Sequence, residues 1–355
     1  MKKRQLLFAF IVVVMYVQNL HAQGERAVWS KQKANEWYKQ YGWLRGCDFI
    51  PHTAINQLEM WQKETFDTAA ISLDLSYAES IGLNCMRVFL HHAAWQIDPG
   101  GFKNRVGQYL AIAQRHGIVT ILVFFDDCWN DTYHTGTQPL PKKGIHNSGW
   151  IKDPGKLYYD EPTLVDTLQV YVKDILTTFK NDKRILLWDL YNEPGNGNCG
   201  NKSLPLLQKI FKWGRQVDPS QPLSAGVWTS DLTVLNNYQL ANSDVITYHD
   251  YNNELTHAKT IDSLKKYSRP LICTEYMARL RDSRFDNIMP ILKANKVVAI
   301  NWGLVAGKTN TMYAWDTPIP SGEEPKIWFH DIFRPDGTPF SEKEIAFIKS
   351  LTGKK

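Results

Sequence analysis

The chain has 355 residues, of which 43% are hydrophobic, 22% charged and 12% aromatic, including 13 Trp and 16 Tyr. This composition is typical of a folded protein. Only one apolar run approaches membrane-spanning length, which excludes a polytopic membrane protein. The formal net charge is +5, and Lys2, Lys3 and Arg4 carry part of it in a segment that we expect to be removed. The remaining balance is too small to indicate a nucleic-acid partner.

The N-terminus is predicted to be a signal peptide. Lys2-Lys3-Arg4 precedes an apolar run from Leu6 to Val17, and Ala22 offers a small residue for cleavage. The alternative, an uncleaved membrane anchor, is disfavoured because the run is shorter than the roughly 18 residues of a spanning helix. We therefore expect residues 1–22 to be cleaved, a mature domain of residues 23–355 in the periplasm or outside the cell, and no stable membrane span.

The cysteines are odd in number, so at least one of them is unpaired; the five are Cys47, Cys85, Cys128, Cys199 and Cys273. Cys47, Cys85 and Cys273 fall in apolar runs and are expected to be buried as small hydrophobic residues. Cys128 and Cys199 fall in predicted loops, where export would permit a disulfide, although the sequence leaves that pairing open. The sequence contains no CxxC or HExxH metal motif.

Eight short apolar runs rich in β-branched and aromatic residues predict strands that are buried on both faces, as in a parallel sheet. They are Trp43–Ile50, Asn84–Leu90, Val119–Phe125, Ile185–Tyr191, Leu223–Trp228, Val245–Tyr248, Leu271–Thr274 and Val297–Trp302.

Helical patterns separate these runs. Apolar residues recur every three or four positions from Leu164 to Phe179 and from Phe285 to Leu292, and Leu73, Tyr77 and Ile81 form a third stripe before Gly82. Eight strands with intervening helices and no Ser- or Pro-rich linker predict a single α/β domain, a (β/α)8 barrel. The segment from Cys128 to Asp160 is predicted to be a long loop at the catalytic face.

Polar residues follow most of the predicted strands, where a barrel presents its catalytic groups. The list comprises His91-His92, Asp126-Asp127, Asn192-Glu193, His249-Asp250-Tyr251 and Glu275, with Trp228 and Trp302 ending two further strands. Glu193 and Glu275 would face each other across the barrel mouth. A single strand-end Glu usually pairs with an Arg, but two carboxylates in this arrangement indicate the acid/base and nucleophile of a glycosidase.

Leu190-Tyr191-Asn192-Glu193-Pro194 resembles the strand-four signature of clan A glycoside hydrolases of the cellulase-like family 5 type, and Cys273-Thr274-Glu275-Tyr276 resembles the segment that carries their nucleophile. The resemblance covers about residues 43–315. It implies that Asn192 contacts the sugar 2-hydroxyl, Glu193 is the acid/base and Glu275 is the nucleophile.

Further elements in the same strand order extend the resemblance. Arg87 and Tyr251 match the residues that support the nucleophile, His249 belongs to the strand-six His-x-Tyr motif, and Trp302 matches the Trp that floors the central sugar subsite. The chain departs from the family pattern where Asp126-Asp127-Cys128-Trp129 replaces the usual strand-three His, and His91-His92 matches only loosely. These departures leave the substrate open.

Each supporting residue also has a structural alternative. Arg87 could be a buried barrel Arg, His249 a core imidazole, and any of the Trp residues ordinary core. Asp126-Asp127 could bind sugar hydroxyls, bind a cation or cap a turn. The candidate substrate-binding set is Arg87, His91, Asp126, Trp129, Asn192, Trp228, His249, Tyr251, Trp302 and Trp315.

The sequence thus predicts an exported retaining β-glycosidase that acts on a mannan, xylan or glucan type of polysaccharide or oligosaccharide and needs neither cofactor nor metal. The alternatives are a non-catalytic carbohydrate-binding barrel, which would not need both Glu193 and Glu275, and a metal-dependent hydrolase using His91, His92 and Asp126. The glycan, endo or exo action and the oligomeric state are left open by the sequence.

Overall fold

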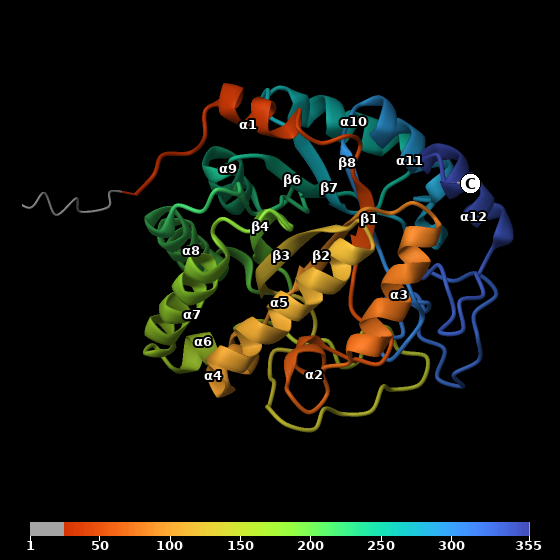
Figure 1. Ribbon diagram of the computed structural model, residues 1–355, viewed down its shortest axis with the longest axis horizontal. Helices are drawn as coiled ribbons and strands as arrows, with labels where there is room; N and C mark the ends of the chain where they lie inside the picture. The colour runs from red at the N-terminus through yellow and green to blue at the C-terminus, as the bar shows by residue number, and fades with distance from the viewer. Residues whose placement is uncertain (1–24, 355) are drawn as a thin grey trace, which may run out of the picture.

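The computed structural model describes residues 25–354, so the predicted signal peptide and its cleavage after Ala22 lie outside the described residues. Eight parallel strands form the centre of the molecule, surrounded by helices (Figure 1). The strands are β1 (Arg45–Asp48), β2 (Cys85–Phe89), β3 (Val119–Asp126), β4 (Ile185–Asn192), β5 (Leu223–Ser224), β6 (Ile246–His249), β7 (Leu271–Glu275) and β8 (Val298–Trp302). Each lies within or beside the apolar run that predicted it.

The sheet closes into a barrel. The strand order β5-β4-β3-β2-β1-β8-β7-β6 is parallel throughout, and β1 pairs with β8 as well as with β2. A bridge between Val227 and Tyr248 joins the two remaining edges just beyond β5. The predicted (β/α)8 barrel is therefore confirmed, and the C-terminal ends of all strands meet at one face.

The described helices follow the strands and cover the outside of the barrel (Figure 1). They are α1 (Lys31–Tyr38), α2 (Gln57–Trp61), α3 (Thr68–Ser80), α4 (His92–Ile97), α5 (Pro99–Arg115), α6 (Leu157–Asp160), α7 (Leu164–Phe179), α8 (Leu204–Val217), α9 (Thr233–Asn242), α10 (Glu254–Lys265), α11 (Phe285–Ala294) and α12 (Glu342–Thr352), with short 3-10 turns η1 (Gly200–Ser203) and η2 (Arg279–Arg281). Within the described residues, no helix is both long and apolar enough to cross a membrane.

Two of the three predicted helical stripes face the barrel. The buried residues of α7 and α11 include the whole predicted sets, whereas the stripe predicted before Gly82 is correct only for Ile81, which is buried, and for Tyr77, which packs partly buried against the core. Leu73 is exposed, and α3 instead buries Ile71, Asp74 and Leu75 on its inner face. Asp74 enters that face because it accepts the backbone N–H and the imidazole of His52, so a polar residue occupies a core position. Gly82 adopts a left-handed conformation just after the helix, as expected for a helix stop.

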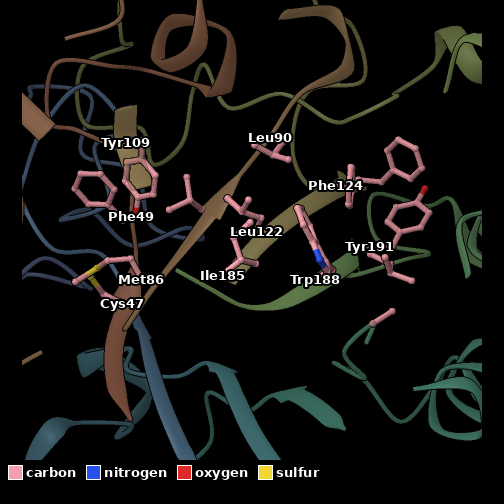
Figure 2. Packing of buried hydrophobic residues seen from close by; sticks show 14 of the residues in the cluster. Cys47, Phe49, Met86, Leu90, Tyr109, Leu122, Phe124, Ile185, Trp188 and Tyr191 are labelled. Carbon is pink, nitrogen blue, oxygen red and sulfur yellow. The ribbon is translucent and has the colours of Figure 1, made fainter. Parts of the chain in front are cut away.

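Apolar side chains fill the space between strands and helices and the lower part of the barrel. Figure 2 shows part of the larger apolar cluster, which lies between strands and helices and includes Cys47, Phe49, Met86, Tyr109 and Trp188. In a second apolar cluster, Trp29 just before α1 and Ala34 within α1 pack against residues near the beginnings of the strands, including Ile121 and Val298. The opposite, C-terminal end of the barrel is left to polar and aromatic side chains.

The cysteines are all unpaired in the described chain. Cys47, Cys85 and Cys273 are buried as predicted. Cys128 lies in the loop after β3, as predicted, but it is buried, and the disulfide with Cys199 that the sequence left open is not present. The backbone N–H of Cys128 donates to the carboxylate of Asp126, the last residue of β3.

Candidate active site

A cavity of about 590 Å³ opens at the C-terminal ends of the strands. Both predicted glutamates line it, together with Asn192, Trp228, His249, Tyr251 and Trp302 from the strand ends and Trp129 and Trp315 from longer loops. The cavity has the size and the mixed aromatic and polar lining of a ligand site. The structure therefore brings most of the predicted site residues together.

Glu193 sits immediately after β4 in a left-handed backbone conformation, with φ of 44°. Its Oε1 atom receives the Nδ1–H of His249 at 2.8 Å, and its Oε2 atom receives the amide of Asn196 at 2.5 Å and the thiol of Cys128 at 3.2 Å. Burial raises the pKa of Glu193, although the hydrogen bonds from Cys128 and Asn196 partly oppose this. Among the described residues no Lys or Arg pairs with it. These surroundings favour a carboxyl group that can be protonated and can donate its proton.

Glu275 ends β7 and has different support. Its Oε1 atom accepts from Arg87 Nη1 at 2.9 Å, and its Oε2 atom accepts from the Tyr251 hydroxyl at 2.8 Å. Burial and the charge of Glu193 raise the pKa of Glu275, while His249, Arg87 and Tyr251 act in the opposite direction. A cation and a hydroxyl donor therefore stabilise the carboxylate form that a nucleophile needs.

Arg87, which is fully buried in β2, connects several strands below the cavity. Besides Glu275 it contacts Asp48 at 2.8 Å and Asp189 at 2.8 Å, and it donates to Asn192 Oδ1 at 2.6 Å. Burial alone would lower the pKa of Arg87, but these carboxylates raise it well above its usual value. Arg87 does not line the cavity, so it supports Glu275 and Asn192 from below and does not touch a ligand directly.

His249 lies between the two glutamates. Its Nδ1 atom is 2.8 Å from Glu193 and 3.4 Å from Glu275. Burial lowers the pKa of His249 to about 4, which favours a neutral ring, and its Nδ1 hydrogen bond goes to Glu193. One carboxylate oxygen of each glutamate and this nitrogen all lie within 4.8 Å of one another.

The separation of the glutamates decides between two chemistries. Retaining glycosidases have carboxyl groups about 5 to 5.5 Å apart, whereas inverting enzymes leave about 6.5 to 9.5 Å for a water molecule. One carboxylate oxygen of Glu193 and one of Glu275 lie within 4.8 Å of each other, which favours the shorter separation of a retaining enzyme. The geometry is that of a nucleophile and an acid/base acting in a double displacement.

Besides Arg87, two further members of the predicted substrate-binding set do not reach the cavity. Asp126 and His91 are buried and do not line the cavity. Asp126 accepts from Asn192 Nδ2 at 2.9 Å, Trp150 Nε1 at 2.7 Å and the backbone of Cys128, so it holds Asn192 in place. His91 accepts from the backbone of Ala93 and contacts the carbonyl of Lys152, and these groups occupy both of its ring nitrogens.

Asp127 and His92 also have structural partners. Asp127 accepts from Tyr191, Ser203 and the backbone of Gly195, which identifies it as a cap for the turn that carries Glu193. His92 is hydrogen-bonded to Asp153 and Tyr133. The group of side chains at this place that could hold a metal ion consists of His91, His92 and Asp153. Asp126 is not a member, so the metal alternative predicted from His91, His92 and Asp126 is not supported in that form.

Some residues of the site have no clear signal in the sequence. The sequence indicates Cys128 only as a possible disulfide partner, and Asn196 has no signal beyond its position three residues after Glu193. His146 and Asn147 come from the middle of the loop after β3, and His330 comes from a segment beyond the region of family resemblance. A polar residue inside a long loop has no strand periodicity to mark its direction, which is why these three were missed.

The barrel and the paired glutamates define a glycoside hydrolase. Residues 46–308 match the cellulase family, glycosyl hydrolase family 5, and the chain belongs to that family. It is therefore an enzyme that acts on a polysaccharide or oligosaccharide by the retaining mechanism. No curated protein sequence matches the chain.

Solved structures with this fold share little sequence with the chain. The exo-β-1,4-mannosidase from Opitutaceae bacterium strain TAV5 has a TM-score of 0.61 at 14% identity, covering 88% of this chain and 60% of that chain. The endo-β-1,4-mannanase from Thermotoga petrophila has a TM-score of 0.55 at 14% identity, covering 88% and 76%. A GH5_18 structure from Streptomyces cattleya in complex with Manb1-4GlcNAc has a TM-score of 0.59 at 11% identity, covering 87% and 80%.

Proposed function

We propose that this enzyme hydrolyses β-mannosidic bonds of mannan-type glycans, with Glu193 as acid/base and Glu275 as nucleophile. The observation that carries the mechanism is the unequal support of the two glutamates. Arg87 and Tyr251 stabilise Glu275 as a carboxylate, whereas no described Lys or Arg pairs with Glu193, whose imidazole neighbour His249 has a lowered pKa.

The reaction then has two steps. Glu275 attacks the anomeric carbon while Glu193 protonates the departing oxygen, which gives a covalent glycosyl-enzyme and a free alcohol. Glu193, now a carboxylate, takes a proton from water as that water displaces Glu275. The sugar leaves with its original anomeric configuration, and Glu193 is protonated again.

The choice of mannan is supported by the names of similar structures, several of which are mannanases or mannosidases. A panel of nitrophenyl β-D-mannoside, β-D-glucoside, β-D-xyloside and β-D-galactoside tests it. We expect the mannoside to have the highest kcat/KM. A preference for another sugar would overturn the proposed substrate, while inactivity on all four and on the matching oligosaccharides would overturn the assignment of the mechanism to this site.

Activity that persists in EDTA would support the glutamate mechanism over the metal-dependent alternative. Complete loss of activity, with recovery on adding a divalent cation, would favour the metal-dependent alternative.

We also propose that the enzyme is exported after cleavage behind Ala22, on the basis of Lys2-Lys3-Arg4 and the apolar run that follows. N-terminal sequencing of protein secreted from the native host should begin at Gln23, and an intact Met1 would contradict the proposal.

A further inference from the structure

The loops around the cavity differ greatly in length on its two sides. Long segments follow β1 (residues 49–67), β3 (residues 127–163) and β8 (residues 303–341), whereas those after β4, β5, β6 and β7 span only 193–203, 225–232, 250–253 and 276–284. Because β1 and β2 lie between β8 and β3 in the barrel, the long loops all rise on the same side. One side of the site is therefore much more enclosed than the other.

The β3 and β8 loops are joined to each other. Backbone bonds link Ile319 N to Gly144 O at 3.0 Å and Asn147 N to Thr309 O at 2.8 Å, and His146 Nδ1 donates to Tyr313 O at 2.8 Å. We call the joined segments 142–150 and 309–331 the end wall. The β1 loop supports it from outside, since Asn56 donates to the carbonyl of Gly149. The end wall is thus a packed structure and not a pair of separate flaps.

The end wall contains buried polar atoms without hydrogen-bond partners. His330 and Asn147 both line the cavity, and both are almost completely buried, at 1% exposure each. Among the residues that the structure describes, neither His330 Nε2 nor Asn147 Oδ1 has a hydrogen-bond partner. Buried polar atoms are normally paired, so two unpaired atoms on residues that line one cavity indicate a place where ligand hydroxyls could be accepted.

Both atoms are acceptors. His330 uses its Nδ1 proton to donate to the carbonyl of Met277 at 2.6 Å, and burial lowers the pKa of His330 well below its usual value, so Nε2 is unprotonated. Asn147 offers a carbonyl oxygen. The partners they need are donors, and a free sugar hydroxyl is such a donor, whereas an oxygen that already carries the next sugar is not.

The direction of the substrate follows from the two carboxylates. The departing group lies toward Glu193 on β4, where Asn196 and Trp228 line the cavity from short loops. The sugar attacked by Glu275 lies toward Trp302 on β8, the strand beside β7, and an indole ring is a suitable surface for the apolar face of a sugar. Beyond Trp302 this sugar meets the end wall.

We infer that the end wall closes the glycone side of the cleft, so that the enzyme removes single sugars from non-reducing chain ends, with His330 and Asn147 accepting hydrogen bonds from hydroxyls that only a terminal sugar leaves free. This inference rests on the proposed function. It deepens that function by assigning exo action, which the family alone does not decide.

The first experiment uses the unmodified enzyme. β-1,4-Mannotetraose reduced with borohydride should yield mannose and mannotriitol as the first products. Nitrophenyl β-mannobioside should release nitrophenol only after a lag, because the first cut removes the terminal mannose. Mannobiose as an initial product, or nitrophenol without a lag, would overturn exo action, and early mannitol would overturn its direction. If the nitrophenyl monosaccharide panel selects another sugar, the same substrates built from that sugar apply, so failure of the proposed mannan substrate is separable from failure of this inference.

The second experiment opens the end wall. A Cβ atom on Gly144 would lie 1.7 Å from the carbonyl oxygen of Ile319, so Gly144→Ala forces the β3 and β8 loops apart. Gly136→Ala is the matched control: this glycine lies in the same loop and also has positive φ, but a Cβ there meets no atom within 4 Å. We expect Gly144→Ala to raise the ratio of mannobiose to mannose from reduced mannotetraose about tenfold. The control should keep the original ratio, and an unchanged ratio in a folded Gly144→Ala enzyme would contradict the inference.

Discussion

The thiol of Cys128 donates a hydrogen bond to the carboxylate of Glu193, with Sγ 3.2 Å from Oε2. Burial raises the pKa of the Cys128 thiol well above its usual value, so the thiol remains a donor at any working pH. Its sulfur also lies 3.4 Å from the amide nitrogens of Asn192 and Asn196. Cys128 therefore connects the acid/base to the two amides beside it.

Cys128→Ala should move the basic limb of the kcat/KM profile to higher pH. The thiol stabilises the charged form of Glu193 and so lowers its pKa, and its loss raises that pKa by up to about one unit. The acid/base must be protonated in the first step, so activity extends to higher pH. Profiles of Cys128→Ala and Cys128→Ser, which keeps a donor, give the comparison. A basic limb that moves to lower pH in the Ala variant would contradict this role.

The two glutamates should respond differently to substitution. Glu275→Ala should abolish turnover of every substrate, because no other group in the described site can form the covalent intermediate. Glu193→Ala should retain activity on dinitrophenyl glycosides, whose departing group needs little protonation, and azide should accelerate it to give a glycosyl azide of retained configuration. NMR of the azide product is the measurement. A glycosyl azide of retained configuration from Glu275→Ala, with an inverted azide from Glu193→Ala, would reverse the two roles, provided that circular dichroism shows both proteins to be folded.

Arg87→Met should destabilise the fold strongly. The substitution leaves Asp48, Asp189 and Glu275 buried without their shared cation, and removing one partner of a buried ion pair costs about 3 to 5 kcal/mol. Urea denaturation measures the loss in the free energy of unfolding. Arg87→Lys keeps the charge but cannot reach all of these partners, so it should recover part of the stability and little of kcat. Equal free energies of unfolding for the Met variant and the unmodified enzyme would contradict the prediction, because the buried carboxylates would then not depend on Arg87 for charge compensation.

The barrel and its catalytic pair could be predicted from the sequence because both depend on regular patterns. Buried parallel strands give continuous apolar runs, and the residue after each run falls at the same face, so Glu193 and Glu275 could be placed together. The direction of a side chain within an irregular segment has no such pattern. Asp126 and His91 come at strand ends as Glu193 does, yet neither lines the cavity. Asp126 accepts a hydrogen bond from the amide of Asn192, and His91 contacts the backbone carbonyl of Lys152.

The end wall could not be predicted for a related reason. His146, Asn147 and His330 come from two loops that are about 180 residues apart in sequence and meet only in three dimensions. Their contact depends on close approach at Gly144 and on backbone bonds, neither of which leaves a pattern of residue types. The error in α3 has the same origin, since Asp74 is buried by a tertiary contact with His52.

Asp331 should make the stability of the enzyme fall as pH rises from about 4 to about 7. It is buried below Trp302 beside a small cavity of about 20 Å³, with both carboxyl oxygens 2.9 Å from the Thr311 hydroxyl. Burial raises the pKa of Asp331 from 3.8 to about 7, although Thr311 and Arg279 oppose the shift. Between these values the folded state binds more protons than the unfolded state, so the free energy of unfolding decreases with pH.

Asp331→Asn tests this directly, because an amide of the same shape keeps an oxygen for Thr311 but cannot ionise. Its free energy of unfolding, measured in urea at pH 4, 5.5 and 7, should fall less steeply than that of the unmodified enzyme, by at most about 4 kcal/mol over the range. Asp262→Asn, at an exposed position on α10, is the control and should leave the slope unchanged. Asp126, whose pKa burial also raises to about 7, remains in both proteins and should preserve part of the slope. An Asp331→Asn curve parallel to that of the unmodified enzyme would mean that Asp331 keeps the same protonation state on unfolding.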